Sequence, residues 1–133
     1  MDLRIPVWQF VRIMVELERR ASGRAGGTGS VYDEWRDAWA ELDTRLTDLG
    51  DRDARAFSDL MMEQEVVVSC RSSHLPEVRR TTGTLVRKMK AEVRNEADAQ
   101  RKQDLRFEIR ELETFARGLA KRQKKAPNNP GIR

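Results

Sequence analysis

Cys70 and His74 carry the most reactive side chains in this sequence. They lie four positions apart, so on one helix they would share a face. Such a pair can ligate a metal or act as nucleophile and base. Zinc needs three or four ligands, however, and the sequence has one cysteine and one histidine. We therefore expect a half-buried thiol and a helix-end histidine, with no metal site and no cofactor.

Carboxylates and glycines also occur in groupings that suggest chemistry. Asp33 with Glu34, and Glu63 with Glu65, are close pairs, but 36% of the chain is charged and such pairs are expected on solvated faces. A di-iron bundle would need Glu-x-x-His motifs, and the sequence has none. The glycine-rich run 22–30 follows a predicted helix and contains no lysine, whereas a phosphate-binding loop follows a strand and carries Lys-Ser or Lys-Thr. We therefore predict no catalytic residues and no enzyme.

Basic residues concentrate toward the C-terminus. Residues 33–65 hold eleven acidic and four basic side chains, whereas the chain from residue 76 onward holds sixteen basic and eight acidic ones. Five cations fall within residues 117–125, after the last acidic residue, and they repel one another unless an anion lies near. Each could neutralise a nucleic-acid phosphate without reading base sequence. The predicted phosphate contacts are Arg106, Arg110, Arg117, Lys121, Arg122, Lys124 and Lys125.

Other interpretations of this charge stay open. An acidic protein surface could replace nucleic acid, or the cations could be solvated or balanced by the acidic segment. Pairs at i, i+4 spacing, such as Asp98 with Lys102 and Glu113 with Arg117, merely solubilise a helix. Among nucleic acids, RNA or single strands are favoured slightly, because no helix-turn-helix, zinc-finger or ribbon signature is present.

Three predicted helices precede the basic region. Residues 6–21 are apolar over most of the helical circumference, so we expect this helix to be buried in a bundle or between subunits. Residues 53–73 predict the third helix; Val66–Val68 also suits a short strand, but no partner strand is evident. The helix between them begins at a Ser30 N-cap and ends at Gly50. Its apolar seam has coiled-coil spacing and comprises Trp35, Trp39, Leu42, Leu46 and Leu49.

The remaining helical stretch, about 76–123, gives two conflicting signals. Its composition of strong helix formers favours one continuous helix. It has two apolar stripes, rotated by about 150–160° from each other on an ideal helix. Either the helix breaks near residues 95–99, or a rod about 70 Å long uses opposite faces at its two ends. Propensity favours the rod. The first stripe comprises Val78, Leu85, Met89 and Val93, and the second comprises Leu105, Ile109, Leu112, Ala116 and Leu119.

Together these features predict an all-α protein, a four- or five-helix bundle with a long C-terminal helix over about 76–123 and coiled-coil-like packing. Residues 1–125 would form a single helical domain with a flexible linker at 22–30, and residues 126–133 a disordered tail. No stretch has the roughly 18 apolar residues of a membrane span, and a lone cysteine fits a reducing compartment. We therefore expect a cytoplasmic protein without membrane contact.

The predicted function is that of a non-catalytic accessory protein that contacts nucleic acid through its basic C-terminal helix. We expect it to work as a homo-oligomer or as a subunit of a larger complex. The alternative is a helical protein–protein adaptor or chaperone-like oligomer without nucleic-acid binding. Apolar stripes on the first and last helices would dock partner helices through Trp8, Val11, Val15, Leu105, Ile109, Leu112 and Leu119.

Overall fold

The computed structural model describes residues 1–22 and 31–125, which form five α-helices, one short 3-10 helix and two strands. The predicted all-α class is confirmed, with a small sheet as an addition. Most of the predicted linker, including Ser30, and the predicted tail lie outside the described residues. The chain divides into two compact units, Met1–His74 and Leu75–Arg133. Among the described residues, no helix is both long and apolar enough to span a bilayer.

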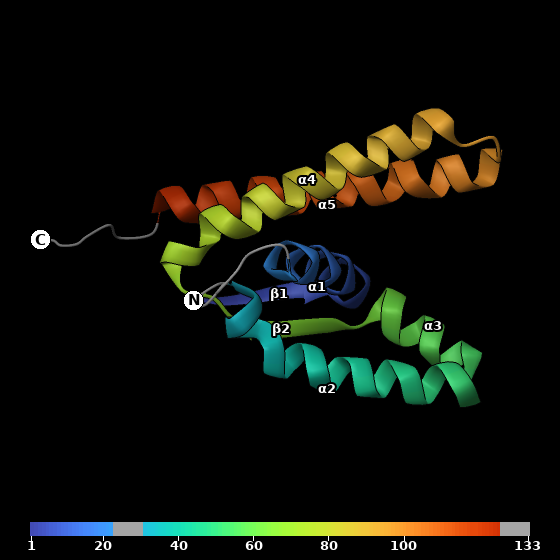
Figure 1. The fold of residues 1–133 in the computed structure, drawn as a ribbon, viewed down its shortest axis with the longest axis horizontal. Helices are drawn as coiled ribbons and strands as arrows, with labels where there is room; N and C mark the ends of the chain where they lie inside the picture. Colours follow the sequence, from blue (N-terminus) through green and yellow to red (C-terminus); the bar gives the residue numbers. More distant parts are fainter. Residues whose placement is uncertain (23–30, 126–133) are drawn as a thin grey trace, which may run out of the picture. The chain divides into compact units, whose positions relative to one another are not determined.

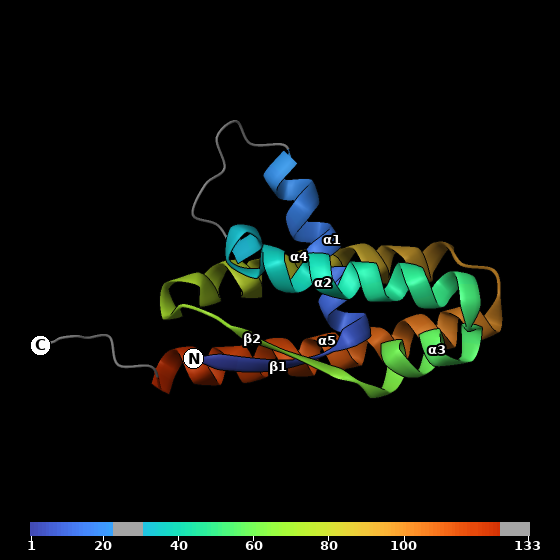
Figure 2. The same ribbon diagram turned by 90° about the horizontal axis from the view of Figure 1, so that it is seen from below.

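The first unit contains a two-stranded antiparallel sheet, whose strands run side by side (Figure 2). β1 (Asp2–Pro6) pairs with β2 (Glu65–Ser69) in a register that places Leu3 opposite Val68. Leu3 and Ile5 are buried while their neighbours along β1 are more exposed, which is the period-two pattern of a half-buried strand. The sheet therefore contributes one apolar face to the core of this unit.

The predicted helix over 53–73 is wrong beyond Glu63. α3 spans only Ala54–Glu63, and Asp53 caps it by accepting a hydrogen bond from the Ala56 N–H at 3.1 Å. The β-branched run Val66–Val68 then continues as β2, because the N-terminal residues supply the partner strand that the sequence did not reveal.

Two longer helices complete the first unit. α1 (Val7–Ser22) runs across the direction of the strands, and α2 (Val31–Arg52) packs against α1 and α3 (Figure 2). The ring of Phe10 contacts two tryptophans, with its centroid 5.8 Å from that of Trp35 and 6.3 Å from that of Trp39. The expected burial of α1 is confirmed for most of its circumference: the buried apolar side chains are Val7, Trp8, Phe10, Ile13, Met14 and Leu17.

The second unit is an antiparallel helical hairpin rather than a rod. The 3-10 turn η1 (Ser72–His74) ends the first unit, and α4 (Leu75–Asn95) and α5 (Ala99–Lys125) then lie side by side (Figure 1). The continuous helix favoured over 76–123 is therefore wrong, and the alternative of a break near 95–99 is confirmed. Buried side chains line both helices: Val78, Leu85 and Met89 on α4, and Leu105, Ile109, Leu112 and Leu119 on α5.

Asp98 explains where the chain turns. Its side chain accepts a hydrogen bond from the Arg101 N–H at 2.9 Å, and its carbonyl accepts the first helical bond of α5 from Lys102. This is the geometry of an N-cap, which satisfies amides that would otherwise lack partners at the start of a helix. The two apolar stripes would point in different directions on one continuous helix. In the hairpin they face each other.

Candidate nucleic-acid interface

Five of the predicted cations form a single row along α5. On a helix that advances about 100° per residue, they fall within an arc of about 60° and extend over about 27 Å. All five side chains are exposed. We refer to this row as the α5 basic stripe: Arg106, Arg110, Arg117, Lys121 and Lys124.

Most acidic residues of α5 lie on other faces than this stripe. Asp104, Glu108 and Glu111 project at least about 80° from its nearest member on the helical wheel. Glu113 lies at its edge, where it forms an ion pair with Lys90 of α4 at 3.1 Å. In the described part of the chain, no member of the stripe has an ion-pair partner. The stripe therefore presents uncompensated positive charge.

α4 adds cations beside the stripe that the sequence interpretation missed. Lys90 lines a hollow of about 280 Å³ together with Arg106 and Arg110. Arg79 donates to Gln123 at 2.7 Å and so lies near the C-terminal end of α5. These residues lie close together only in a hairpin. They could have been predicted from the sequence only by assuming the helix break, which helix propensity disfavoured.

Two predicted phosphate contacts do not join the stripe. Arg122 is exposed, but it lies about 100° around the helix from Lys121 and has an interaction of its own. The side chain of Lys125 lies outside the described residues. The prediction from the sequence grouped cations that are close along the chain. On the helix, cations that are neighbours in the sequence point in different directions.

The expected docking stripe on α5 is not exposed. Its four leucine and isoleucine side chains are between 0% and 6% exposed, on a helix that packs along α4. On α1, Trp8 is buried, Val11 is partly buried and Val15 is 45% exposed. The chain therefore covers most of the predicted interface itself. Assembly into an oligomer or a complex stays a prediction. The covered α5 residues are Leu105, Ile109, Leu112 and Leu119.

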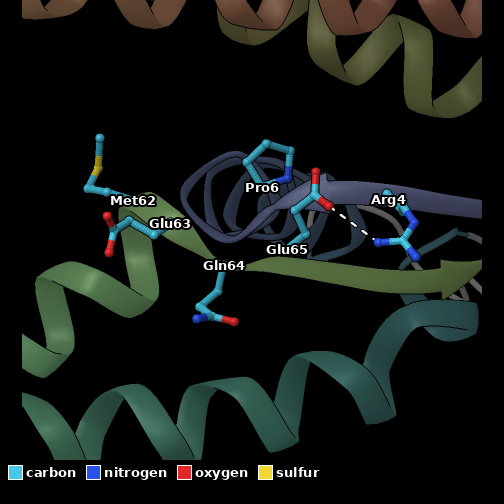
Figure 3. Close-up of a pocket in the computed structure, with 6 residues that line it drawn as sticks. All are labelled: Arg4, Pro6, Met62, Glu63, Gln64 and Glu65. Carbon is cyan, nitrogen blue, oxygen red and sulfur yellow. Dashed lines mark hydrogen bonds and ion pairs between the residues drawn. The ribbon is translucent and has the colours of Figure 1, made fainter.

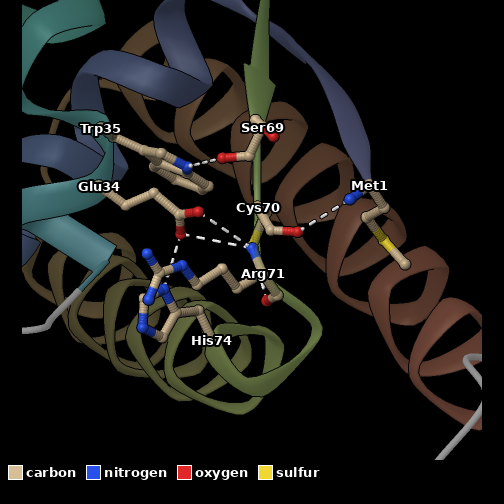
Figure 4. A network of polar contacts seen from close by, with 7 residues as sticks. All are labelled: Met1, Glu34, Trp35, Ser69, Cys70, Arg71 and His74. Carbon is tan, nitrogen blue, oxygen red and sulfur yellow. Dashed lines mark hydrogen bonds and ion pairs between the residues drawn. The ribbon is translucent and has the colours of Figure 1, made fainter.

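A polar network in the first unit holds the residues with the most reactive side chains (Figure 4). His74 Nδ1 lies 2.6 Å from Oε1 of Glu34, and the other carboxylate oxygen, Oε2, accepts the Arg71 N–H at 3.1 Å. Cys70 is buried, and its Sγ lies 3.5 Å from the Arg71 carbonyl. The thiol was expected to be half-buried, but it is fully buried, with Cys70 1% exposed. No pattern in the sequence indicated Glu34 as the partner of His74.

Further hydrogen bonds of this network connect secondary-structure elements that are distant in the sequence. The Trp35 indole N–H donates to the Ser69 carbonyl at 3.0 Å, and the N-terminal amino group of Met1 donates to the Cys70 carbonyl at 3.1 Å. Within residues 1–22 and 31–125, no three His, Cys, Asp or Glu side chains gather closely enough to hold a metal ion. The contacts are those of a structural tie between α2, β1 and the end of β2.

An open hollow of about 430 Å³ at the junction of α3 and β2 has mixed charge (Figure 3). Arg4 and Glu65 form an exposed ion pair across it at 3.5 Å, and Glu63 adds a second carboxylate. Met62 lies at its rim with 58% of its surface exposed. Because its one cation is already paired, this hollow does not suit an anion.

Comparisons with known proteins found no match: no family model fits the sequence, and neither a curated protein nor a solved structure is significantly similar to the chain. The α5 basic stripe is therefore interpreted from its own geometry.

Proposed function

We propose that this chain is a non-catalytic binding protein that contacts the nucleic-acid backbone through the α5 basic stripe. One observation supports the proposal above all: five exposed cations share one face of a helix, and the carboxylate at the edge of that face, Glu113, is paired with Lys90. A nucleic-acid strand carries a regular row of negative phosphates surrounded by condensed counterions. Cations that replace those counterions bind the strand, because the released ions gain entropy.

The proposed binding has little sequence specificity. Lysine and arginine contacts to phosphate fix position and supply affinity, whereas sequence is read at the edges of the bases. A stripe about 27 Å long spans several phosphates, and the exposed side chains that form it are all charged. The protein would therefore serve as an accessory factor that holds a strand.

Two arginines in the middle of the stripe test this function. The double substitution Arg110→Gln and Arg117→Gln removes two of the five charges and keeps two long polar side chains on the helix. We expect fluorescence anisotropy with a labelled single-stranded RNA or DNA at about 50 mM salt to show an affinity loss on the order of tenfold to 100-fold.

The matched control removes two exposed arginines from the first unit. Arg45→Gln in α2 and Arg55→Gln in α3 change the net charge of the chain equally, and both side chains are exposed. This control should keep the affinity of the unmodified protein within about twofold. Equal losses in the two double variants would mean that net charge alone attracts the strand. No binding by the unmodified protein would exclude nucleic acid and leave an acidic protein surface as the alternative partner.

A further inference from the structure

The hollow between α4 and α5 differs in chemistry from the stripe beside it. Its lining consists of Val93 and Ile109, which are apolar, and of Lys90, Arg106 and Arg110, which are cationic. Its volume of about 280 Å³ is close to the lower end of the ~300–1,000 Å³ range of small-molecule pockets. The hollow is therefore of a size for one small group.

The two kinds of lining residue call for different parts of a ligand. Ile109 is 6% exposed and Val93 is partly buried, so together they offer an apolar surface that a phosphate would not use. Arg106 and Arg110 lie one helical turn apart on α5, and Lys90, which pairs with Glu113 at 3.1 Å, lines the hollow from α4. A group that is flat and apolar on its face but attached to an anion satisfies both. A nucleotide has this combination.

We propose that the hollow receives one unstacked base of a single nucleic-acid strand, with the phosphates on either side held by Arg106 and Arg110. The proposal rests on the proposed function and names the substrate as a single strand. In a duplex the bases are stacked and their faces are covered, so a base reaches an apolar surface only from a single strand, a loop or a bulge. Guanidinium groups beside the hollow are themselves good stacking partners for bases.

A strand that lacks its bases distinguishes binding of a base from binding of the phosphates. We compare a labelled strand of about 12 thymidines, within the ~4–16-nucleotide site sizes of single-strand binders, with an equally long strand of abasic deoxyribose phosphates. The two carry the same charge, so the α5 basic stripe binds both. Occupation of the hollow predicts that the full-length protein binds the thymidine strand about fivefold or more tightly than the abasic strand.

The substitution Val93→Gln tests whether the preference for the thymidine strand arises in the hollow. Glutamine places a polar chain on the apolar surface, leaves the charge unchanged and is a better helix former than valine. The matched control is Val67→Gln in β2, where valine is 53% exposed in the first unit. The preference for thymidine should fall to within about twofold in Val93→Gln and stay unchanged in Val67→Gln, while binding of the abasic strand is the same in all three proteins.

Two results would overturn the inference, and they differ from the failure of the proposed function. The unmodified protein could bind both strands equally, or Val93→Gln could keep the full preference; either result leaves the phosphate contacts in place but removes the base from the hollow. If neither strand binds at about 50 mM salt, the proposed function itself fails. Helical circular dichroism of each variant confirms that loss of preference is not loss of folding.

Discussion

Glu34 lies in an acidic segment, yet its carboxylate contacts residues that are far from it in the sequence. Its carboxylate accepts the Arg71 N–H and lies 2.6 Å from His74 Nδ1, which joins the start of α2 to residues about forty positions later. Both side chains of the pair are less than one-fifth exposed. A partly buried hydrogen-bonded carboxylate of this kind stabilises the fold mainly because its loss leaves its partners without acceptors.

Substitution of Glu34 tests its role as a structural tie. Glu34→Ala should lower the free energy of unfolding of the first unit by about 1–3 kcal/mol, since the Arg71 N–H and His74 both lose their acceptor. Glu34→Gln should cost less, because its amide oxygen still accepts one hydrogen bond. Urea unfolding followed by tryptophan fluorescence measures this unit selectively, since all three tryptophans lie within Met1–His74.

Asp37→Ala is the matched control for that experiment. Asp37 is exposed on the same helix, one turn from Glu34, and its removal changes the charge equally. It should shift stability by no more than about 0.5 kcal/mol. Equal unfolding curves for Glu34→Ala and the unmodified protein would contradict the tie.

At the scale of elements, the apolar pattern predicted the hairpin better than helix propensity did. The stripes through Leu85 and through Leu112 point about 150–160° apart on one helix, and that mismatch correctly indicated a break. Helix propensity favoured one continuous helix, because the break between α4 and α5 involves only residues 96–98, whose types are common inside helices. The decisive feature is the cap at Asp98, and an isolated aspartate is too common in this chain to be recognised as one.

The Asp98 cap makes a local prediction. Asp98→Ala removes the acceptor of the Arg101 N–H and should destabilise the first turn of α5 by about 1 kcal/mol. Amide hydrogen exchange at Arg101 should therefore accelerate about fivefold, while exchange in the middle of α5 changes less. Glu111→Ala, an exposed carboxylate within α5, is the charge-matched control and should leave the exchange at Arg101 unchanged. Equal exchange at Arg101 in Asp98→Ala would show that packing alone fixes the turn.

The sheet was harder to predict than the hairpin. β1 is only five residues long, and its partner β2 lies about sixty residues further along the chain. The run Val66–Val68 suggested a strand, but a strand is stable only with a partner, and the alternation of Leu3 and Ile5 with polar residues is too short to stand out. Non-local pairing of this kind has little signature in the sequence of either segment.

The candidate site was predictable where it depends on one helix. Arg106, Arg110 and Arg117 fall on one face from helical spacing once α5 is assigned, and all three side chains are exposed. Lys90 was missed because its place beside Arg106 depends on how two helices pack. Periodicity fixes which residues share a face, whereas tertiary contacts decide what lies next to that face.

At the scale of the whole molecule, charge separates by unit. The eleven acidic residues between 33 and 65 belong to the first unit, and the stripe belongs to the second. The proposed nucleic-acid strand would be attracted to α5 and repelled by the acidic residues of α2 and α3, although the net charge of the chain is only +4. Under the proposed function, this asymmetry would direct a strand to the second unit.

The salt dependence of nucleic-acid binding by the full-length protein tests the central claim most directly. If the five cations of the α5 basic stripe each neutralise a phosphate of a single strand, the slope of log Kobs against log salt concentration should be about −3.5, or a loss of about 100-fold between 50 and 200 mM. Arg110→Gln with Arg117→Gln should reduce the slope to about −2, and Arg45→Gln with Arg55→Gln should not change it. A slope near zero, or one that the stripe substitutions leave unchanged, would contradict the account.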